Sequence, residues 1–200
     1  MSVILLATHN AHKVEELKAL LSSDSELCHF EVVSLSDIGY HQDIIEDGDT
    51  FEKNALIKAR VGAGLGYITV ADDSGLEVDA LDGAPGVYSA RYSGEGATDA
   101  SNNSLLIQNM AHIPSDKRTA QFVSVVACVF PDGRYFTVRG ESQGLILTEG
   151  VGCGGFGYDP LFYQIEIKKT FAQASPEEKN FISHRGRAMV KFCEQIKSYL

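Results

Sequence analysis

A change in the spacing of apolar residues near the start of the chain constrains the fold more than any other feature. Val3–Ala7 is a continuous apolar run, and Thr8–His12 is polar. Four apolar residues then recur at the spacing of one helix face: Val14, Leu17, Leu20 and Leu21. This order predicts a strand, a turn and a helix. Glu31–Ser34 is expected to form a second short strand.

The next predicted helix and strand lie beside acidic residues. Asp49 and Glu52 stand three apart, as in a capping box, and predict a helix through about Arg60. We expect that helix to stop at the glycines that follow it: Gly62, Gly64 and Gly66. Tyr67–Ala71 is typical of a buried strand, which we expect to end in a turn at residues 72–75, Asp-Asp-Ser-Gly.

The middle of the chain predicts a hairpin, and its end predicts helices. Thr119–Phe130 and Arg134–Glu141 are β-type runs separated by Pro-Asp-Gly. Thr98 is expected to cap a helix that reaches Met110. Ser175, followed by proline and then by glutamate three residues on, begins another helix. A last helix after residue 183 carries an apolar stripe at helical spacing: Met189, Phe192, Ile196 and Tyr199.

Together these elements predict an α/β protein with a mixed sheet, because strands and helices alternate early and hairpins follow. The 200 residues fit a single domain over residues 1–200, with two closely packed lobes. Lysine and arginine total 17 against 27 acidic residues, a net charge of −10, which disfavours a nucleic-acid partner. No run approaches the roughly 18 apolar residues of a membrane span, so we expect a soluble cytoplasmic protein without a membrane partner. The four cysteines form no C-x-x-C pair and are expected to be reduced thiols.

Two segments have the composition of a polyphosphate and metal site. Thr8–Lys13 lies where a strand passes into a helix, so unpaired N–H groups and the Lys13 charge suit a phosphate; simple helix capping by Thr8 and Asn10 is the alternative. The segment lacks the glycines and the ending of a Walker A loop. Glu46 and Asp73 are candidate ligands for Mg²⁺, which usually takes one or two carboxylates; solvated turn residues are the alternative.

Two later segments are suited to a nucleotide. Residues 150–157 contain five glycines and lead into an aromatic pair, Phe156 and Tyr158, whose ring faces could stack on a base or pack in a core. Lys179 is followed by a cationic group in Ser183–Arg187 that suits a polyanion or an electron-rich base edge. A solvated basic face is the alternative for that group.

Taken together, four motifs in order resemble the inosine triphosphate pyrophosphatase family, over a span from Ala7 to about Ala188. They are ATHNAHK, ADDSGLEVDAL with GAPGVYSARYSG, GGFGYDPLF and SHRGRA. The resemblance implies a two-lobed α/β architecture with a long central mixed β-sheet flanked by helices and a cleft between the lobes. It also implies a homodimer that cleaves ITP, dITP and XTP to the monophosphate and pyrophosphate, removing them from the nucleotide pool.

The resemblance also assigns roles to individual residues. Glu46 and Asp73 would hold Mg²⁺, and Asp73 would also accept a proton from the attacking water. The residues expected to contact the nucleoside triphosphate are Thr8, His9, Asn10, Ala11, His12, Lys13, Ser74, Phe156, Gly157, Tyr158, Asp159, Lys179, His184 and Arg185. Donors on His184 or Arg185 would favour a 6-oxo purine over adenine.

Two positions depart from the family pattern. His9 stands where glycine is common, and Cys153 stands where threonine or another small residue is common. A positive φ at His9 would strain the phosphate loop. Two other functions fit the same motifs. One is a pyrophosphatase for modified pyrimidine or methylated nucleotides, and the other is a nucleotide-binding regulator without turnover.

Overall fold

The computed structural model describes residues 3–200 and divides the chain into two compact units. Unit 1 comprises Met1–Asp73, Val125–Arg139 and Ala188–Leu200, and unit 2 comprises Ser74–Ser124 and Gly140–Arg187. The chain therefore passes from one unit to the other four times. Each unit is described by itself below.

The strands form one seven-stranded sheet in the order β2-β1-β3-β4-β5-β6-β7. Their bounds are β1 Val3–Leu6, β2 Glu31–Ser34, β3 Ile68–Val78, β4 Thr119–Val129, β5 Tyr135–Ile146, β6 Phe162–Gln164 and β7 Lys169–Thr170. Strand β1 runs parallel to β2 and β3, whereas β6 runs antiparallel to β5 and β7. The predicted mixed sheet of an α/β fold is confirmed.

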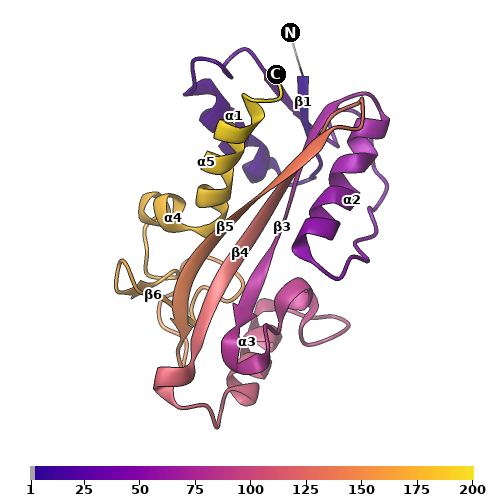
Figure 1. The fold of residues 1–200 in the computed structure, drawn as a ribbon. Helices are drawn as coiled ribbons and strands as arrows, with labels where there is room; N and C mark the ends of the chain where they lie inside the picture. The colour runs from indigo at the N-terminus through magenta and orange to yellow at the C-terminus, as the bar shows by residue number, and fades with distance from the viewer. Residues whose placement is uncertain (1–2) are drawn as a thin grey trace. The chain divides into compact units, whose positions relative to one another are not determined.

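Five α-helices and three short 3₁₀ helices are present among residues 3–200. The α-helices are α1 Ala11–Ser22, α2 Phe51–Gly64, α3 Asp99–Asn109, α4 Pro176–Ile182 and α5 His184–Ile196. The 3₁₀ helices are η1 Asp79–Leu81, η2 Gly86–Arg91 and η3 Ser115–Lys117. In unit 1, α1 and α5 lie on one side of the strands and α2 lies on the other (Figure 1).

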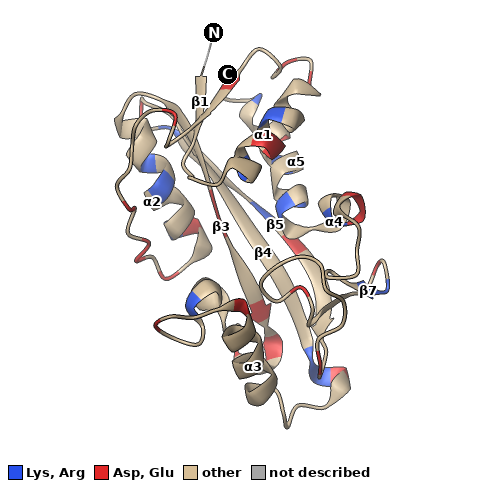
Figure 2. Cartoon of the chain, turned by 180° about the vertical axis from the view of Figure 1, so that it is seen from behind, with Lys and Arg blue, Asp and Glu red and all other residues tan. Residues whose placement is uncertain are grey.

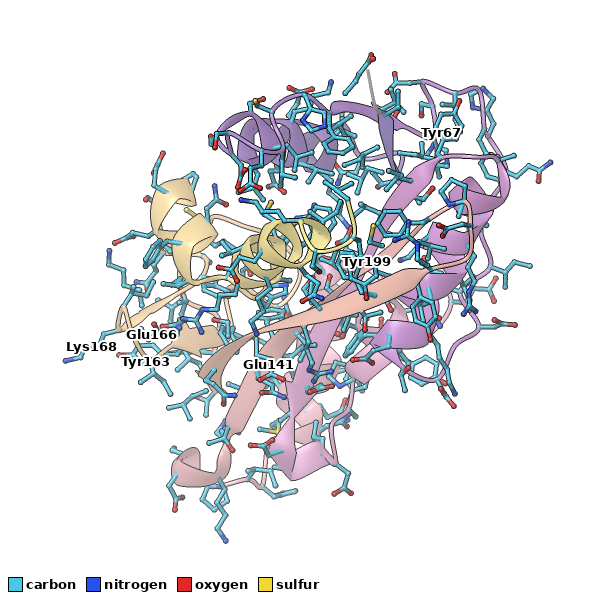
Figure 3. All side chains as sticks on the ribbon, turned by 45° about the horizontal axis from the view of Figure 1, so that its top comes forward. Tyr67, Glu141, Tyr163, Glu166, Lys168 and Tyr199 are labelled. Atoms are coloured by element: carbon cyan, nitrogen blue, oxygen red, sulfur yellow. The ribbon has the colours of Figure 1, made fainter. Side chains whose placement is uncertain are left out.

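The core of unit 1 is built by the predicted apolar faces. Val14, Leu17 and Leu21 of α1 and Phe192 and Ile196 of α5 are buried in one cluster with side chains of β1, β3 and β4. The strand over Val3–Leu6, the strand over Glu31–Ser34 and the helix that follows Asn10 agree with the sequence prediction. Tyr199 packs against this cluster although it lies beyond the end of α5 (Figure 3).

Helix α2 differs from its prediction at both ends. Its N-cap is Thr50, whose side chain accepts a hydrogen bond from the Lys53 amide, and not Asp49. The helix also passes through Gly62 instead of stopping there. A Cβ at Gly62 would lie 2.4 Å from a methyl group of Leu5 and 2.5 Å from the hydroxyl of Thr69. This glycine therefore permits close packing of the helix on the sheet and does not act as a stop signal.

Strand β3 also differs from its prediction, because it continues through Asp72–Gly75 where a turn was expected. Leu76 and Val78 explain the continuation: both are fully buried in the core of unit 2, so the extended backbone must carry on to place them there. Asp72 and Asp73 are therefore neighbouring strand residues, whose side chains point to opposite faces of the sheet.

The core of unit 2 is aromatic. Phe122, Phe162 and Phe171 contact one another, with ring centroids 4.7–5.8 Å apart. Leu106 of α3 and Met110, the C-cap residue of this helix, belong to the same cluster. The predicted caps are confirmed, since Thr98 caps α3 and Ser175 caps α4 through capping boxes. The turn between β6 and β7 carries Glu166 and Lys168, which are labelled in Figure 3.

The chain has no helix in residues 3–200 that is long and apolar enough to cross a membrane. All four cysteines are free thiols, as predicted: Cys28 and Cys153 are exposed, whereas Cys128 and Cys193 are buried. Burial raises the pKa of the Cys128 thiol to about 12 and that of Cys193 to about 11, so both stay protonated near neutral pH. Lysine and arginine residues are spread over several elements instead of lining one helix (Figure 2).

Candidate functional site

The N-terminus of α1 is closed by local hydrogen bonds. The Asn10 carboxamide accepts from the backbone amides of His12, at 2.9 Å, and Lys13, at 3.4 Å. The Thr8 hydroxyl accepts from the Asn10 amide at 3.1 Å. The capping interpretation of Asn10 is therefore confirmed. The helix dipole and the charge of Lys13 can still attract an anion to this helix end.

Lys13 forms an ion pair with Asp72. The ammonium nitrogen lies 2.8 Å from Asp72 Oδ2, and the carboxylate is only 3% exposed. The pair joins the first turn of α1 to the middle of β3, both in unit 1. A buried carboxylate needs such a partner, because an unpaired charge at this depth would be strongly destabilising. Asp72 thus fixes the position of the Lys13 ammonium.

Asp73 points to the opposite face, toward α2. The ammonium of Lys58 lies 2.6 Å from Glu46 Oε2 and 3.7 Å from Asp73 Oδ1. The side chains of Lys58 and Asp73 are 14% and 16% exposed, and that of Glu46 is 34% exposed. One half-buried lysine therefore brings together the two carboxylates that the sequence singled out as candidate metal ligands.

The structure brings only part of the acidic segment to this place. Asp49 pairs instead with Lys53, at 2.6 Å on the exposed side of α2. Within residues 3–200 no cluster of three or more His, Cys, Asp or Glu side chains could hold a metal ion. A cation at Glu46 and Asp73 would therefore have two protein carboxylates and would need other oxygen ligands, as Mg²⁺ commonly does.

In unit 2, the glycine-rich segment is a loop with one exposed aromatic ring. Phe156 is 77% exposed, whereas Tyr158 is 4% and Asp159 is 2% exposed. The Tyr158 hydroxyl donates to the Ser89 carbonyl at 2.8 Å. Burial raises the pKa of this hydroxyl, with smaller contributions from Tyr92 and Asp99, so it remains a donor. Phe156, and not Tyr158, has a ring face that is free to stack.

Asp159 organises the polar side of this loop. Its carboxylate accepts from the Phe156 amide at 2.9 Å and forms a short ion pair with Lys179 of α4. The Lys179 ammonium also lies 4.6 Å from the centre of the Phe156 ring. A Cβ at Gly155 would collide with the Asp159 carboxylate, at 2.1 Å, which explains a glycine at this position.

The start of α5 places the remaining basic residues. The ring of His184 stacks on Phe122 at 4.9 Å between centroids, and both His184 and Arg185 are half-buried. Arg187 is engaged elsewhere, with the Glu166 carboxylate and the Glu141 carbonyl. A Cβ at Gly186 would lie 2.0 Å from the Asn180 carbonyl oxygen, so the glycine lets α5 start close to α4. Ser74 is exposed on β3.

Comparison with known proteins places these residues in a family. The model of the Ham1 family matches residues 4–195, which is nearly the whole chain. This chain belongs to the Ham1 family. The resemblance that the four motifs carry is therefore confirmed.

Curated relatives match the Ham1 chain over almost its full length. The dITP/XTP pyrophosphatase of Desulforamulus reducens is 50% identical over 192 residues, covering 96% of this chain and 94% of that protein. The dITP/XTP pyrophosphatase of Clostridium perfringens is 44% identical, and the match covers both chains completely.

Solved structures of Ham1 proteins share the fold. The Ham1 protein of Staphylococcus aureus matches with a TM-score of 0.91 and 36% identity over the whole of both chains. A HAM1 protein from Coxiella burnetii gives the same score and identity over 99% of this chain and 100% of its own. A nucleoside-triphosphatase / dITP/XTP pyrophosphatase from Mycobacterium abscessus has a TM-score of 0.81 and 45% identity, covering 95% and 98% of the two chains.

His9 does not strain the backbone of the candidate phosphate-binding segment. Within residues 3–200, the residues other than glycine with positive φ are Asp82 and Lys168, so His9 has an ordinary backbone conformation. Its exposed ring lies 3.1 Å from the Ser36 hydroxyl, between Nδ1 and Oγ. The histidine is accommodated because its side chain turns toward the segment after β2.

Lys58 lies in the candidate site but was not singled out from the sequence. A signal for it exists, because Phe51, Ala55, Lys58 and Gly62 share one face of α2, and three of these four are buried against the sheet. A lysine within an apolar stripe needs an anionic partner nearby, because an unpaired buried charge is costly. Glu46, which precedes α2 in the sequence, and Asp73, which follows it, are such partners.

Proposed function

We propose that this Ham1 protein hydrolyses the non-standard purine nucleoside triphosphates dITP, ITP and XTP to the nucleoside monophosphate and pyrophosphate. The structural observation that supports it most directly lies in unit 1. Lys13 and Lys58 pair with the consecutive residues Asp72 and Asp73 on opposite faces of one strand, and Glu46 joins Asp73 at Lys58. The names of the relatives, at 44–50% identity, support the same reaction.

Glu46 and Asp73 are proposed to hold Mg²⁺. The donor set fits a hard divalent cation, because both side chains offer carboxylate oxygens and both reach the same ammonium group of Lys58. When bound, the ion would neutralise charge on the phosphate oxygens. Lys58 offsets part of the repulsion between the two carboxylates, which keeps them close before any cation arrives.

Asp73 is proposed as the proton acceptor for the attacking water. Its carboxylate is held on a rigid strand and is only 16% exposed, so its position varies little. A positioned general base is typically worth about 10²–10⁴-fold in rate. Asp72 is engaged with Lys13 on the other face and is therefore assigned a supporting role, namely to place the Lys13 charge.

The residues of the triphosphate segment are assigned by their position at the start of α1. We propose that Thr8, His9, Asn10, Ala11, His12 and Lys13 bind the triphosphate. Lys13 supplies a full positive charge beside the positive end of the helix dipole. Residues 9–12 are exposed and Thr8 and Lys13 are half-buried, so the segment is accessible to an anionic ligand.

The residues of unit 2 are assigned to the nucleoside. We propose that Ser74, Phe156, Gly157, Tyr158, Asp159, Lys179, His184 and Arg185 contact it. The exposed Phe156 ring supports stacking of a base, and the Lys179 ammonium beside this ring supports recognition of an electron-rich group. Donors on His184 or Arg185 would favour a 6-oxo purine, because adenine presents an amino group there and would leave the donor unpaired.

Assembly and location complete the proposal. We propose a homodimer, by resemblance to the family, without a nucleic-acid or membrane partner. A cytoplasmic location is supported by the four free cysteines, since thiols persist in reducing compartments. Light scattering on the purified chain should give twice the 21.7 kDa mass of one chain; a mass of one chain would exclude the dimer.

The test is pyrophosphate release from a panel of ITP, XTP, dITP, GTP, ATP and dUTP, with Mg²⁺ and with a chelator. We expect Mg²⁺-dependent release from the first three substrates, well above release from ATP. Preferred hydrolysis of dUTP would indicate a pyrophosphatase for other nucleotides. Tight binding of ITP without pyrophosphate release would indicate a nucleotide-binding regulator.

A further inference from the structure

The position of the exposed Phe156 ring depends on the backbone of its neighbour Gly157. Gly157 has a φ of +59°, a conformation that glycine adopts readily. A Cβ placed there would meet nothing within 4 Å, so surrounding side chains do not impose this conformation. Because glycine can also adopt many other backbone angles, something else must hold the loop if Phe156 is to present its ring in one orientation.

Helix α3 holds Gly157 from both sides. The Gly157 amide donates to Asp99 Oδ2 at 2.7 Å, and the Gly157 carbonyl accepts from Asn103 Nδ2 at 2.9 Å. The amide belongs to the peptide plane before Gly157, and the carbonyl belongs to the plane after it. Fixing both planes fixes φ and ψ of the glycine between them. Asp99 and Asn103 stand four residues apart, so both side chains lie on the same face of the helix.

Helix α3 is itself well anchored within unit 2. Thr98 and Ser101 close its first turn with a capping box. Asn102, which is 4% exposed, accepts from the Ser93 amide at 2.8 Å and donates to the Ala90 carbonyl at 3.2 Å. Leu106 is fully buried in the aromatic core. The two side chains that hold Gly157 therefore stand on a rigid support.

The amide of Asn103 has a second property that favours a specific role. Its Oδ1 atom is buried and has no hydrogen-bond partner in residues 3–200, so burying this group carries a free-energy cost. The donation from Nδ2 to Gly157 is the contact that an apolar side chain of the same size could not make. An asparagine at this position is thus explained by the loop that it holds.

We propose that Asp99 and Asn103 are positioning residues that set the affinity for the nucleobase. They act through the Gly157 peptide, which orients the Phe156 ring. The inference rests on the proposed function, in which Phe156 stacks on the base. It assigns no bond-breaking role to either residue, so their loss changes binding and selectivity more than the rate of the chemical step.

The test compares Asp99→Ala and Asn103→Ala with the wild-type chain. We expect each variant to raise KM for dITP about 10-fold, with kcat within about 2-fold, which is the pattern for lost ground-state binding. The preference for dITP over dATP, measured as the ratio of kcat/KM values, should fall in both. Asp99→Asn should restore KM, because its amide oxygen can still accept from the Gly157 amide.

Controls separate positioning from stability. Gln108→Ala changes an exposed side chain on the same helix and should leave KM and selectivity unchanged. Thermal unfolding identifies variants that lose structure. Unchanged KM in both alanine variants, or a fall in kcat and stability without a change in KM or selectivity, would overturn the proposal.

A binding measurement distinguishes a failure of the positioning role from a failure of the proposed hydrolysis. Calorimetric titration with dITP in the presence of a chelator reports affinity without turnover. If the wild-type chain binds dITP but does not hydrolyse it, and the variants bind it more weakly, the positioning role stands and the proposed reaction is wrong. Hydrolysis by the wild type with equal affinities in all variants overturns only the positioning role. A wild-type chain that neither binds nor hydrolyses dITP overturns both.

Discussion

Replacing Lys58 with methionine tests whether this lysine brings Glu46 and Asp73 together. Methionine keeps a long apolar side chain and removes the charge. The ammonium group lies 2.6 Å from Glu46 and 3.7 Å from Asp73, with the lysine 14% exposed. Breaking a buried ion pair costs about 3–5 kcal/mol and an exposed one about 0–1 kcal/mol. Because Glu46 is 34% exposed, we expect the free energy of unfolding to fall by about 1–3 kcal/mol, between these limits.

The assay is urea unfolding near neutral pH, with a chelator and then with Mg²⁺. Without Lys58 the two carboxylates repel each other, so a cation that binds them should stabilise the variant more than the wild type. Lys53→Met is the matched control, because Lys53 pairs with Asp49 on the exposed side of the same helix and should cost about 0.5 kcal/mol or less. Equal unfolding free energies for the two variants, with equal responses to Mg²⁺, would refute the reasoning.

Three further predictions concern packing, pH and stacking. Gly62→Ala should lower the free energy of unfolding by about 1 kcal/mol in the same urea assay, because overpacking against the sheet outweighs the gain in helix propensity. Gly64→Ala is the control: a Cβ there meets nothing within 4 Å, so this variant should be as stable as the wild type or more stable. Hydrogen bonding to Lys197 holds the pKa of Asp24 below its ordinary value. The pair therefore stabilises the fold when the pH is above the ordinary pKa of Asp24, and this stabilisation is lost as the pH falls through the lowered pKa. Lys197→Met should be less stable than the wild type near neutral pH, and the difference in stability, followed by circular dichroism, should shrink in acid. Phe156→Ala should raise KM for dITP by about 10-fold or more in steady-state kinetics, since stacking contributes about 1–3 kcal/mol per base; an unchanged KM would remove Phe156 from base binding.

Most elements of the fold could be predicted from local patterns. The strand at Val3–Leu6, the capped helices after Thr98 and Ser175, and the hairpin around residues 131–133 follow from hydrophobic spacing and turn chemistry. Their signals are local, because the residues that specify each element lie within it. The mixed sheet follows from the order of these elements along the chain.

The errors arose where a residue type serves a distant contact. Residues 72–75 have turn composition, yet they continue β3 because the core of unit 2 buries the residues that follow. Gly62 was expected to end its helix, yet it lies inside α2, where the absence of a side chain allows Leu5 of β1 and Thr69 of β3 to approach closely. In both cases tertiary packing overrode the local preference, which a single sequence does not display.

Most residues of the candidate site could be predicted from the sequence, whereas the contacts between them could not. Motifs indicated Lys13, Glu46 and Asp73, but the partners that place them are distant in sequence: Asp72 lies 59 residues from Lys13. Lys58, Asp99 and Asn103 were not singled out, because a lysine or an asparagine in a helix is ordinary on its own. Their importance follows from what the fold brings beside them.

The measurement that tests the central claim most directly is a single-turnover reaction with dITP and Mg²⁺, in the wild type and in Asp73→Asn. We predict that the wild type forms dIMP and pyrophosphate in equal amounts. The variant should still fold, as shown by a cooperative urea transition, and its rate at saturating dITP should fall by at least about 10²-fold. Wild-type turnover in Asp73→Asn, or release of inorganic phosphate instead of pyrophosphate, would contradict the account.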